Sequence, residues 1–163
     1  MVLGDSQVKY LPECRQWNER IEVFSFSGYR IQDLPAELEE VVPFFNNIWL
    51  HLGTNNMPKE KPSEAVAHYE KLLRRVRAVH PTCSIFVASV LPRGPSGFRH
   101  EKEDTSWLDL INTKAHVFNS HLQDLAQRYE HVFYVNFWDD FWPRLQVMLS
   151  KYGLHLSHRG SLG

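Results

Sequence analysis

Short apolar segments rich in β-branched and aromatic residues alternate along this chain with longer segments of helical periodicity. The apolar segments have the length and composition of buried β-strands. In the longer ones apolar side chains recur every three or four positions, as Val66, Tyr69 and Leu73 do, which predicts helices with one buried face. The predicted strands cover residues 1–3, 21–25, 48–52, 84–91 and 132–137, and the predicted helices cover residues 7–14, 31–42, 63–79 and 108–129.

Strands separated by helices must be joined by crossover connections, and such connections make neighbouring strands parallel. We therefore predict an α/β fold, a three-layer α/β/α sandwich around a five-stranded, parallel, flavodoxin-like sheet. Ser63 is the predicted N-cap of the third helix, and Pro81 follows its end. The polar segment 92–107 is predicted to be a mobile loop at the rim of the sheet.

Length and composition fit a single domain that covers residues 1–163, with 43% hydrophobic residues and a net charge of −1. Such a charge attracts neither nucleic acid nor an anionic membrane to the domain as a whole, and no apolar run is long enough to span a bilayer. Cys14 and Cys83 lie far apart without a CxxC motif, so neither a disulfide scaffold nor a zinc ribbon is indicated. We expect an intracellular, cytoplasmic protein in a reducing compartment.

The sequence near each end of the chain leads to a further expectation. The first strand is central in the predicted sheet, yet few residues are available to build it, so we expect a domain cut from a longer polypeptide. In the predicted fold a final helix follows the loop that contains His155. The chain reaches Gly163 soon after His155, so we expect a mobile tail.

Chemically versatile residues follow four of the predicted elements. Ser6 comes after the first strand, Gly28 after the second, Asn55 after the third, and His155 lies beyond the last. Because parallel strands place their carboxyl ends at one edge of a sheet, we expect these residues to converge. A hydroxyl, a base and hydrogen-bond donors for an oxyanion are what acyl transfer requires.

The same residues carry a resemblance to a known family. The segments VLGDSQ, FSFSGYRI, LHLGTNN and YGLHLSHRG resemble the four signature blocks of SGNH (GDSL-type) hydrolases, which contribute Ser, Gly, Asn and His in that order. LGTNN and VLPRG are similar to platelet-activating-factor acetylhydrolase-type esterases. The stretch FWDDFWPRLQVMLSKYGLHLSHRG is similar to the esterase domain in the first open reading frame of LINE-type retrotransposons.

The resemblance implies a serine ester hydrolase for small acyl esters or lipids that needs no cofactor. Ser6 would attack the ester carbonyl and His155 would move the proton. The oxyanion would be bound by the backbone N–H groups of Ser6 and Gly28 and by the Asn55 side chain, with Asp5 as a structural residue beside the serine.

One position departs from the family pattern. Tyr152 stands three residues before His155, where the family has an aspartate that orients the imidazole. Either a backbone carbonyl could take that role, giving a Ser–His dyad, or Asp139 or Asp140 could, since both follow the last predicted strand. The alternative function is a catalytically impaired binding or assembly module for RNA or a protein partner.

The remaining features have structural interpretations. The nine histidines show no metal-ligand spacing, and no metal is expected. The basic run Lys71, Arg74, Arg75 and Arg77 indicates a solvated helix face rather than an RNA-binding patch. The pairs 137–138 and 141–142, each Phe-Trp, could line an acyl pocket or contact lipid, and at least half of them are expected in the core. Oligomeric state is left open.

Overall fold

The computed structural model describes residues 1–13, 18, 20–95, 105–144, 148–150, 153–155 and 157. Its centre is one parallel sheet in the order β2-β1-β3-β4-β5. The strands are β1 (Val2–Gly4), β2 (Val23–Ser25), β3 (Asn47–His51), β4 (Ser84–Ala88) and β5 (Val132–Val135). The predicted fold class and strand order are thus confirmed.

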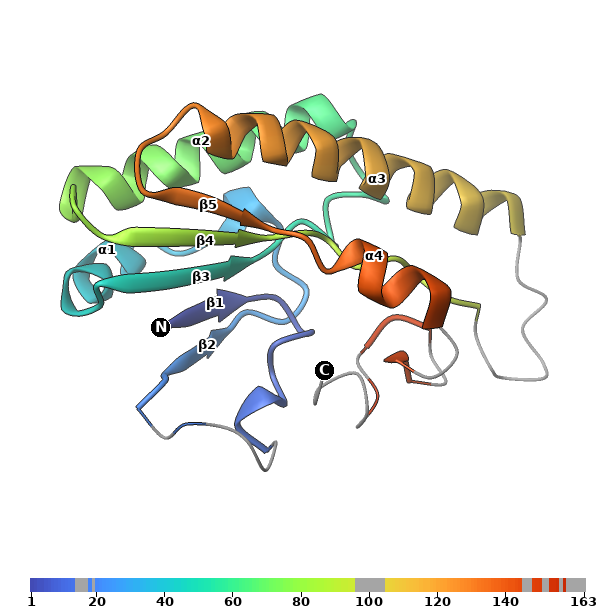
Figure 1. Ribbon diagram of the computed structural model, residues 1–163, viewed down its shortest axis with the longest axis horizontal. Helices are drawn as coiled ribbons and strands as arrows, with labels where there is room; N and C mark the ends of the chain where they lie inside the picture. Colours follow the sequence, from blue (N-terminus) through green and yellow to red (C-terminus); the bar gives the residue numbers. More distant parts are fainter. Residues whose placement is uncertain are drawn as a thin grey trace.

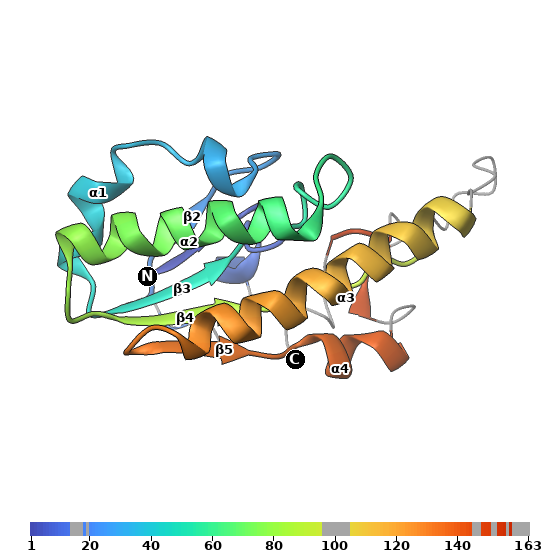
Figure 2. The ribbon, with the colours of Figure 1, turned by 90° about the horizontal axis from the view of Figure 1, so that it is seen from above.

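Two long helices, α2 (Pro62–Val79) and α3 (Thr105–Gln127), lie side by side on one face of the sheet (Figures 1 and 2). Each buries the apolar stripe that its sequence predicts, and Tyr69 of α2 meets Phe118 of α3 in the core. The two short helices are α1 (Leu38–Val41) and α4 (Trp138–Phe141). Among the described residues, no helix combines the length and apolar character that crossing a membrane requires.

Strand register sorts the side chains onto two faces of the sheet. Leu3, Leu50 and Val87 are register partners on three adjacent strands, and all three are fully buried. One position earlier, Trp49, Phe86 and Phe133 are also partners, and their rings stack at centroid distances of 4.9 and 5.3 Å. Because neighbouring residues of a strand point to opposite faces, this aromatic row lies on the face away from Leu50. Phe133 at the sheet edge remains 48% exposed.

Two of the four predicted helices do not form as single helices, and proline accounts for the clearer case. Segment 31–42 is not one helix: it forms a 3-10 turn at Ile31–Asp33, then α1, then a second 3-10 turn at Val42–Phe44. Pro35 disfavours helical geometry in the residue before it and lacks an N–H for a helical hydrogen bond. The segment after β1 forms turns and a 3-10 helix at Leu11–Glu13 instead of the helix predicted over 7–14.

The N-cap of α2 is Lys61 rather than Ser63, because Pro62 occupies the first helical position and the Glu64 carboxylate accepts a hydrogen bond from the Lys61 N–H at 2.9 Å. Most of the predicted mobile loop, residues 96–104, lies outside the described residues, and so do Cys14 and the tail 158–163.

Truncation of the central strand tests this packing. Leu50→Ala in β3 removes a fully buried side chain and should lower the free energy of unfolding by about 2–5 kcal/mol, measured by urea denaturation. The matched control is Leu110→Ala on α3, where the side chain is 56% exposed and the expected change is within about 0.5 kcal/mol. Equal losses in the two variants would contradict the assignment of the core.

Candidate active site

Ser6 lies in a tight turn immediately after β1. The turn is fixed at Asp5, whose N–H donates to the His51 carbonyl at 3.2 Å and whose carbonyl accepts from the Ser25 hydroxyl at 3.0 Å. Asp5 is 1% exposed, and its Oδ1 accepts the Gln7 N–H at 3.0 Å. A Cβ at Gly4 would lie 2.7 Å from a Val8 methyl and 2.9 Å from the His51 carbonyl oxygen. The chain can therefore pass β3 this closely only with glycine at position 4.

His155 reaches this turn from the far end of the sequence. Its Nε2 lies 3.1 Å from the Ser6 Oγ, which is hydrogen-bonding distance. The direction of that bond depends on which imidazole nitrogen carries the proton. The structure thus brings together the two residues that the sequence nominates as nucleophile and base.

The segment that carries His155 is docked through backbone contacts. The His155 carbonyl accepts the Ser150 N–H at 2.7 Å, and the Gly94 N–H donates to the Gly153 carbonyl at 2.8 Å. Gly153 has φ +66, and a Cβ there would lie 2.1 Å from the Gly94 carbonyl oxygen. No side chain fits at this contact, so glycine at position 153 is required for the His155 segment to reach the loop after β4.

Gly28 and Asn55 lie on the loops that follow β2 and β3. Gly28 has φ +81, a conformation that favours glycine, and the Asn55 Nδ2 donates to the Tyr29 carbonyl at 2.9 Å. That bond uses one of the two amide hydrogens of Asn55 and leaves the second available. Among the described residues, no acceptor is found for the backbone N–H groups of Ser6 and Gly28.

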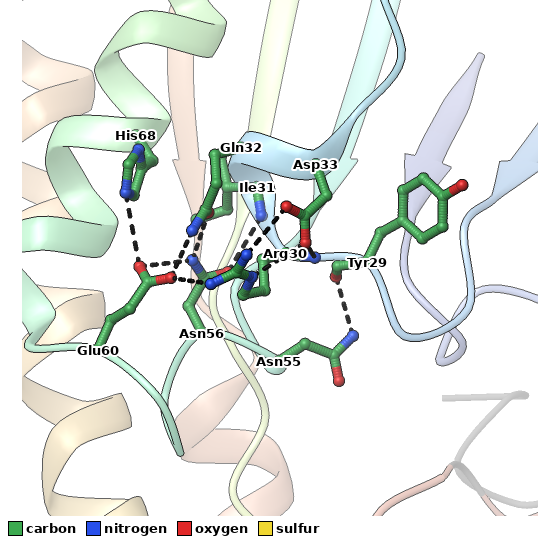
Figure 3. Close-up of polar contacts among 9 residues, drawn as sticks. All are labelled: Tyr29, Arg30, Ile31, Gln32, Asp33, Asn55, Asn56, Glu60 and His68. Atoms are coloured by element: carbon green, nitrogen blue, oxygen red, sulfur yellow. Dashed lines mark hydrogen bonds and ion pairs between the residues drawn. The ribbon is translucent and has the colours of Figure 1, made fainter.

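A polar network joins the Gly28 and Asn55 loops, and sequence reasoning did not predict it (Figure 3). Asn56, which is fully buried, accepts the Ile31 N–H at 3.1 Å and donates to Gln32 at 2.9 Å and to Glu60 at 3.0 Å. Glu60 also accepts hydrogen bonds from Arg30 and Gln32, and His68 lies 3.7 Å from it. The second asparagine of GTNN thereby holds the two loops in register.

The charge of Glu60 is stabilised by this network. Burial alone would raise the pKa of its carboxyl group, but hydrogen bonds from Asn56 and Gln32 and electrostatic interactions with His68 and Arg30 outweigh burial and hold that pKa below its ordinary value. Glu60 is therefore ionised at neutral pH and serves as the charged centre of the network.

The candidate orienting groups are not in contact with His155 within the described part of the chain. Asp139, at the start of α4, accepts a hydrogen bond from Asn136 at 2.8 Å, and Asp140 is exposed. Burial raises the pKa of Tyr134 to about 12. The hydrogen bond with Ser89 lowers this pKa, and the charge of Asp139 raises it further. Tyr152 lies outside the described residues.

The structure agrees with some of the predictions for the basic run and the Phe-Trp pairs and differs from others. Arg74 pairs with Glu70 on the surface of α2, as a solvated face predicts. Arg75 and Arg77 instead donate to backbone carbonyls of other segments, among them Pro35 and Glu130, so the basic run is partly structural. Of the Phe-Trp pairs, Trp138 and Phe141 are buried, as packing predicts, and Trp142 is 50% exposed. In the described ranges no group of three metal-ligating side chains is present.

The sequence profile of the GDSL-like lipase/acylhydrolase family matches residues 3–161, so the chain belongs to this family. The resemblance drawn from the four motifs is confirmed, and the class is that of ester hydrolases. A search of curated proteins gives no match.

Solved structures also match. One, described as a platelet activating factor from Streptococcus pneumonia, is 25% identical with a TM-score of 0.75, and the match covers 98% of this chain and 77% of that one. Est24, a carbohydrate acetylesterase from Sinorhizobium meliloti, is 15% identical with a TM-score of 0.70, covering 99% and 92%. The esterase domain of the zebrafish ZfL2-1 ORF1 protein is 22% identical with a TM-score of 0.41, covering 99% and 90%.

The Glu60 network generates a pH-dependent prediction. Glu60→Gln should lower the free energy of unfolding at neutral pH by about 1–2 kcal/mol, because bonds to a charged acceptor are weakened. A depressed carboxyl pKa stabilises the fold above the ordinary value of about 4.3, and this contribution disappears as pH falls through the folded-state pKa. Urea denaturation from pH 7 to pH 3 should show the difference between wild type and variant shrinking below about pH 4.

The control for this series is Glu37→Gln, at an exposed glutamate before α1. It should differ little from wild type at any pH. A Glu60→Gln deficit that stays constant down to pH 3 would show that the ionised carboxylate is not what holds the loops.

Proposed function

We propose that this protein is a serine ester hydrolase that cleaves small acyl esters or lipids through an acyl-enzyme intermediate. The observation that carries the proposal is the 3.1 Å approach of His155 Nε2 to Ser6 Oγ, made between residues from opposite ends of the chain. Family membership and likeness to a carbohydrate acetylesterase support an ester as the substrate and a small acyl group as the part transferred.

In the first step the Ser6 Oγ attacks the ester carbonyl carbon while His155 Nε2 accepts the hydroxyl proton. The carbonyl oxygen becomes an oxyanion, for which the Ser6 and Gly28 N–H groups and the remaining Asn55 amide hydrogen are the proposed donors. Collapse of the tetrahedral intermediate breaks the ester bond, and the alkoxide leaves with the proton from His155.

Water completes the cycle. It loses a proton to His155 as its oxygen attacks the acyl carbon. The second intermediate then collapses to release the acid, and His155 returns the proton to the Ser6 Oγ. No group outside this set of residues is required for the balance of atoms.

Orientation of His155 is the weak point of the proposed site. With Tyr152 at the position of the usual aspartate, we propose a Ser–His dyad whose imidazole is oriented by a backbone carbonyl, with Asp139 or Asp140 as the other candidates. In proteases, replacing the aspartate lowers kcat by about 10⁴-fold. The expected enzyme is correspondingly slow, which makes serine dependence the first property to establish.

Turnover of p-nitrophenyl acetate and of a longer-chain homologue is the direct assay. Ser6→Ala should abolish it because the attacking oxygen is removed. The matched control is Ser120→Ala, at an exposed position of α3, which should retain wild-type turnover. Tyr152→Asp should raise kcat by supplying an anion to the imidazolium.

Each pattern of activity has a distinct meaning. Turnover that survives Ser6→Ala would contradict the proposed nucleophile. Activity that appears only in Tyr152→Asp would mean a scaffold disarmed at one residue. Inactivity of all variants, together with salt-dependent RNA affinity, would favour the binding module.

Asn55 offers a separate test of the oxyanion site. Asn55→Ala should lower kcat by about 10²–10³-fold with a smaller effect on KM, because its amide would stabilise charge that develops only in the transition state. The control is Asn47→Ala, an exposed asparagine at the opposite end of β3, for which no change in kcat is expected. A change confined to KM would remove Asn55 from the oxyanion site.

A further inference from the structure

Arg93 occupies a rigid position beside the proposed catalytic residues. Both polar groups of its backbone are held by Asn112 of α3, whose Oδ1 accepts the Arg93 N–H at 2.8 Å and whose Nδ2 donates to the Arg93 carbonyl at 2.9 Å. The next residue, Gly94, is the one that binds Gly153 in the His155 segment. The loop after β4 is therefore fixed on both sides, and the arginine side chain starts from a defined point.

The guanidinium extends from this point to the loop after β3. Its Nη2 donates to the carbonyl of Thr54, the residue before Asn55, at 3.2 Å. Its central carbon lies 5.6 Å from the centre of the Trp107 ring, within the range of a cation–π contact. The positive charge thus lies between the loop that bears Asn55 and the Trp107 ring at the start of α3.

Arg93 is less well satisfied than the arginines with structural roles. Arg30 binds two carboxylates, and Arg77 binds four backbone carbonyls. Arg93 has five N–H donors, and the part of the chain that the structure describes offers it the Thr54 carbonyl and no ion pair. Burial lowers the pKa of Arg93, and the charge of Asp5 only opposes that effect.

A partly buried cation that has one hydrogen-bond acceptor among the described residues, next to the loop that bears Asn55, is suited to an anion. We propose that Arg93 binds a negatively charged group, a carboxylate or a phosphate, carried by the ester substrate. This rests on the proposed esterase function and specifies its substrate class. The anion would accept hydrogen bonds from the guanidinium N–H groups that have no partner among the described residues, while Trp107 contacts the cation. Because Thr54 adjoins Asn55, the charged group would sit a short chain length from the ester carbonyl.

The test compares pairs of esters in which one member carries an added carboxylate. On the acyl side the pair is p-nitrophenyl hexanoate and the p-nitrophenyl monoester of adipic acid. On the alcohol side it is phenyl acetate and m-acetoxybenzoate. For at least one pair, Arg93→Met should lower the ratio of kcat/KM for the charged ester to that for the neutral one by about 10- to 100-fold, the range for a hydrogen bond to a charged group.

Four controls accompany this ratio. Arg93→Lys should retain part of the preference, because it keeps the charge and loses the planar fork. Arg128→Met removes an exposed arginine after α3 and should leave the ratio unchanged. Thermal unfolding of each variant reports folding, and Ser6→Ala supplies the background rate. The pair of esters whose kcat/KM ratio falls in Arg93→Met shows whether the anion lies on the acyl or the alcohol side.

A ratio unchanged in both pairs would overturn the proposal while leaving the esterase intact. If wild type turns over none of the esters, the esterase proposal fails, and Arg93 is judged by calorimetry with monomethyl adipate. Binding that weakens at least about tenfold in Arg93→Met supports an anion site, on the same energetic grounds. If the wild type does not bind monomethyl adipate, or if the wild type and Arg93→Met bind it equally, the anion site is rejected.

Discussion

The pairing of β1 with β2 on one side and β3 on the other is the interaction on which the whole site depends. It involves only Val2–Gly4, yet it sets where the chain turns and therefore where Ser6 lies. Both neighbours also contact the turn itself, through the Ser25 hydroxyl and the His51 carbonyl. The three strands end together, so Ser6, Gly28 and Asn55 start from adjacent points of one sheet edge.

The parts of the site that are far apart in sequence are assembled by backbone contacts rather than by side chains alone. Asn55 is oriented by the Tyr29 carbonyl, Asn56 by the Ile31 N–H, and Arg93 by both backbone groups bound to Asn112. Asn119 on α3 likewise binds both backbone groups of Val90: its Oδ1 accepts the Val90 N–H at 2.8 Å, and its Nδ2 donates to the Val90 carbonyl at 2.9 Å. Buried amides thus supply to the loops the hydrogen bonds that a neighbouring strand would supply inside a sheet.

Sequence reasoning predicted the sheet, the strand order and the positions of the four rim residues, because apolar periodicity and turn residues are local signals. It was wrong at segment 31–42, where the spacing of Ile31, Leu34 and Leu38 is helical but Pro35 interrupts the helix. It did not predict the Glu60 network or the position of Arg93. Those residues follow no periodic pattern, and their partners are chosen by the fold. A polar residue in a loop looks the same in sequence whether it is solvated or holds two loops together.

The contact between Gly94 and Gly153 bears on how the proposed activity could be lost over evolution. His155, the proposed base, is held beside Ser6 by a crossing of two backbones that admits no side chain. A mutation as small as an added methyl group at Gly153 would push the histidine segment off the loop after β4. Homologous chains could therefore keep the serine, glycine, asparagine and histidine and still lack esterase activity. A classification based on those four residues alone would wrongly count such chains as enzymes. Gly153 is therefore as informative a marker of the proposed activity as the histidine it positions.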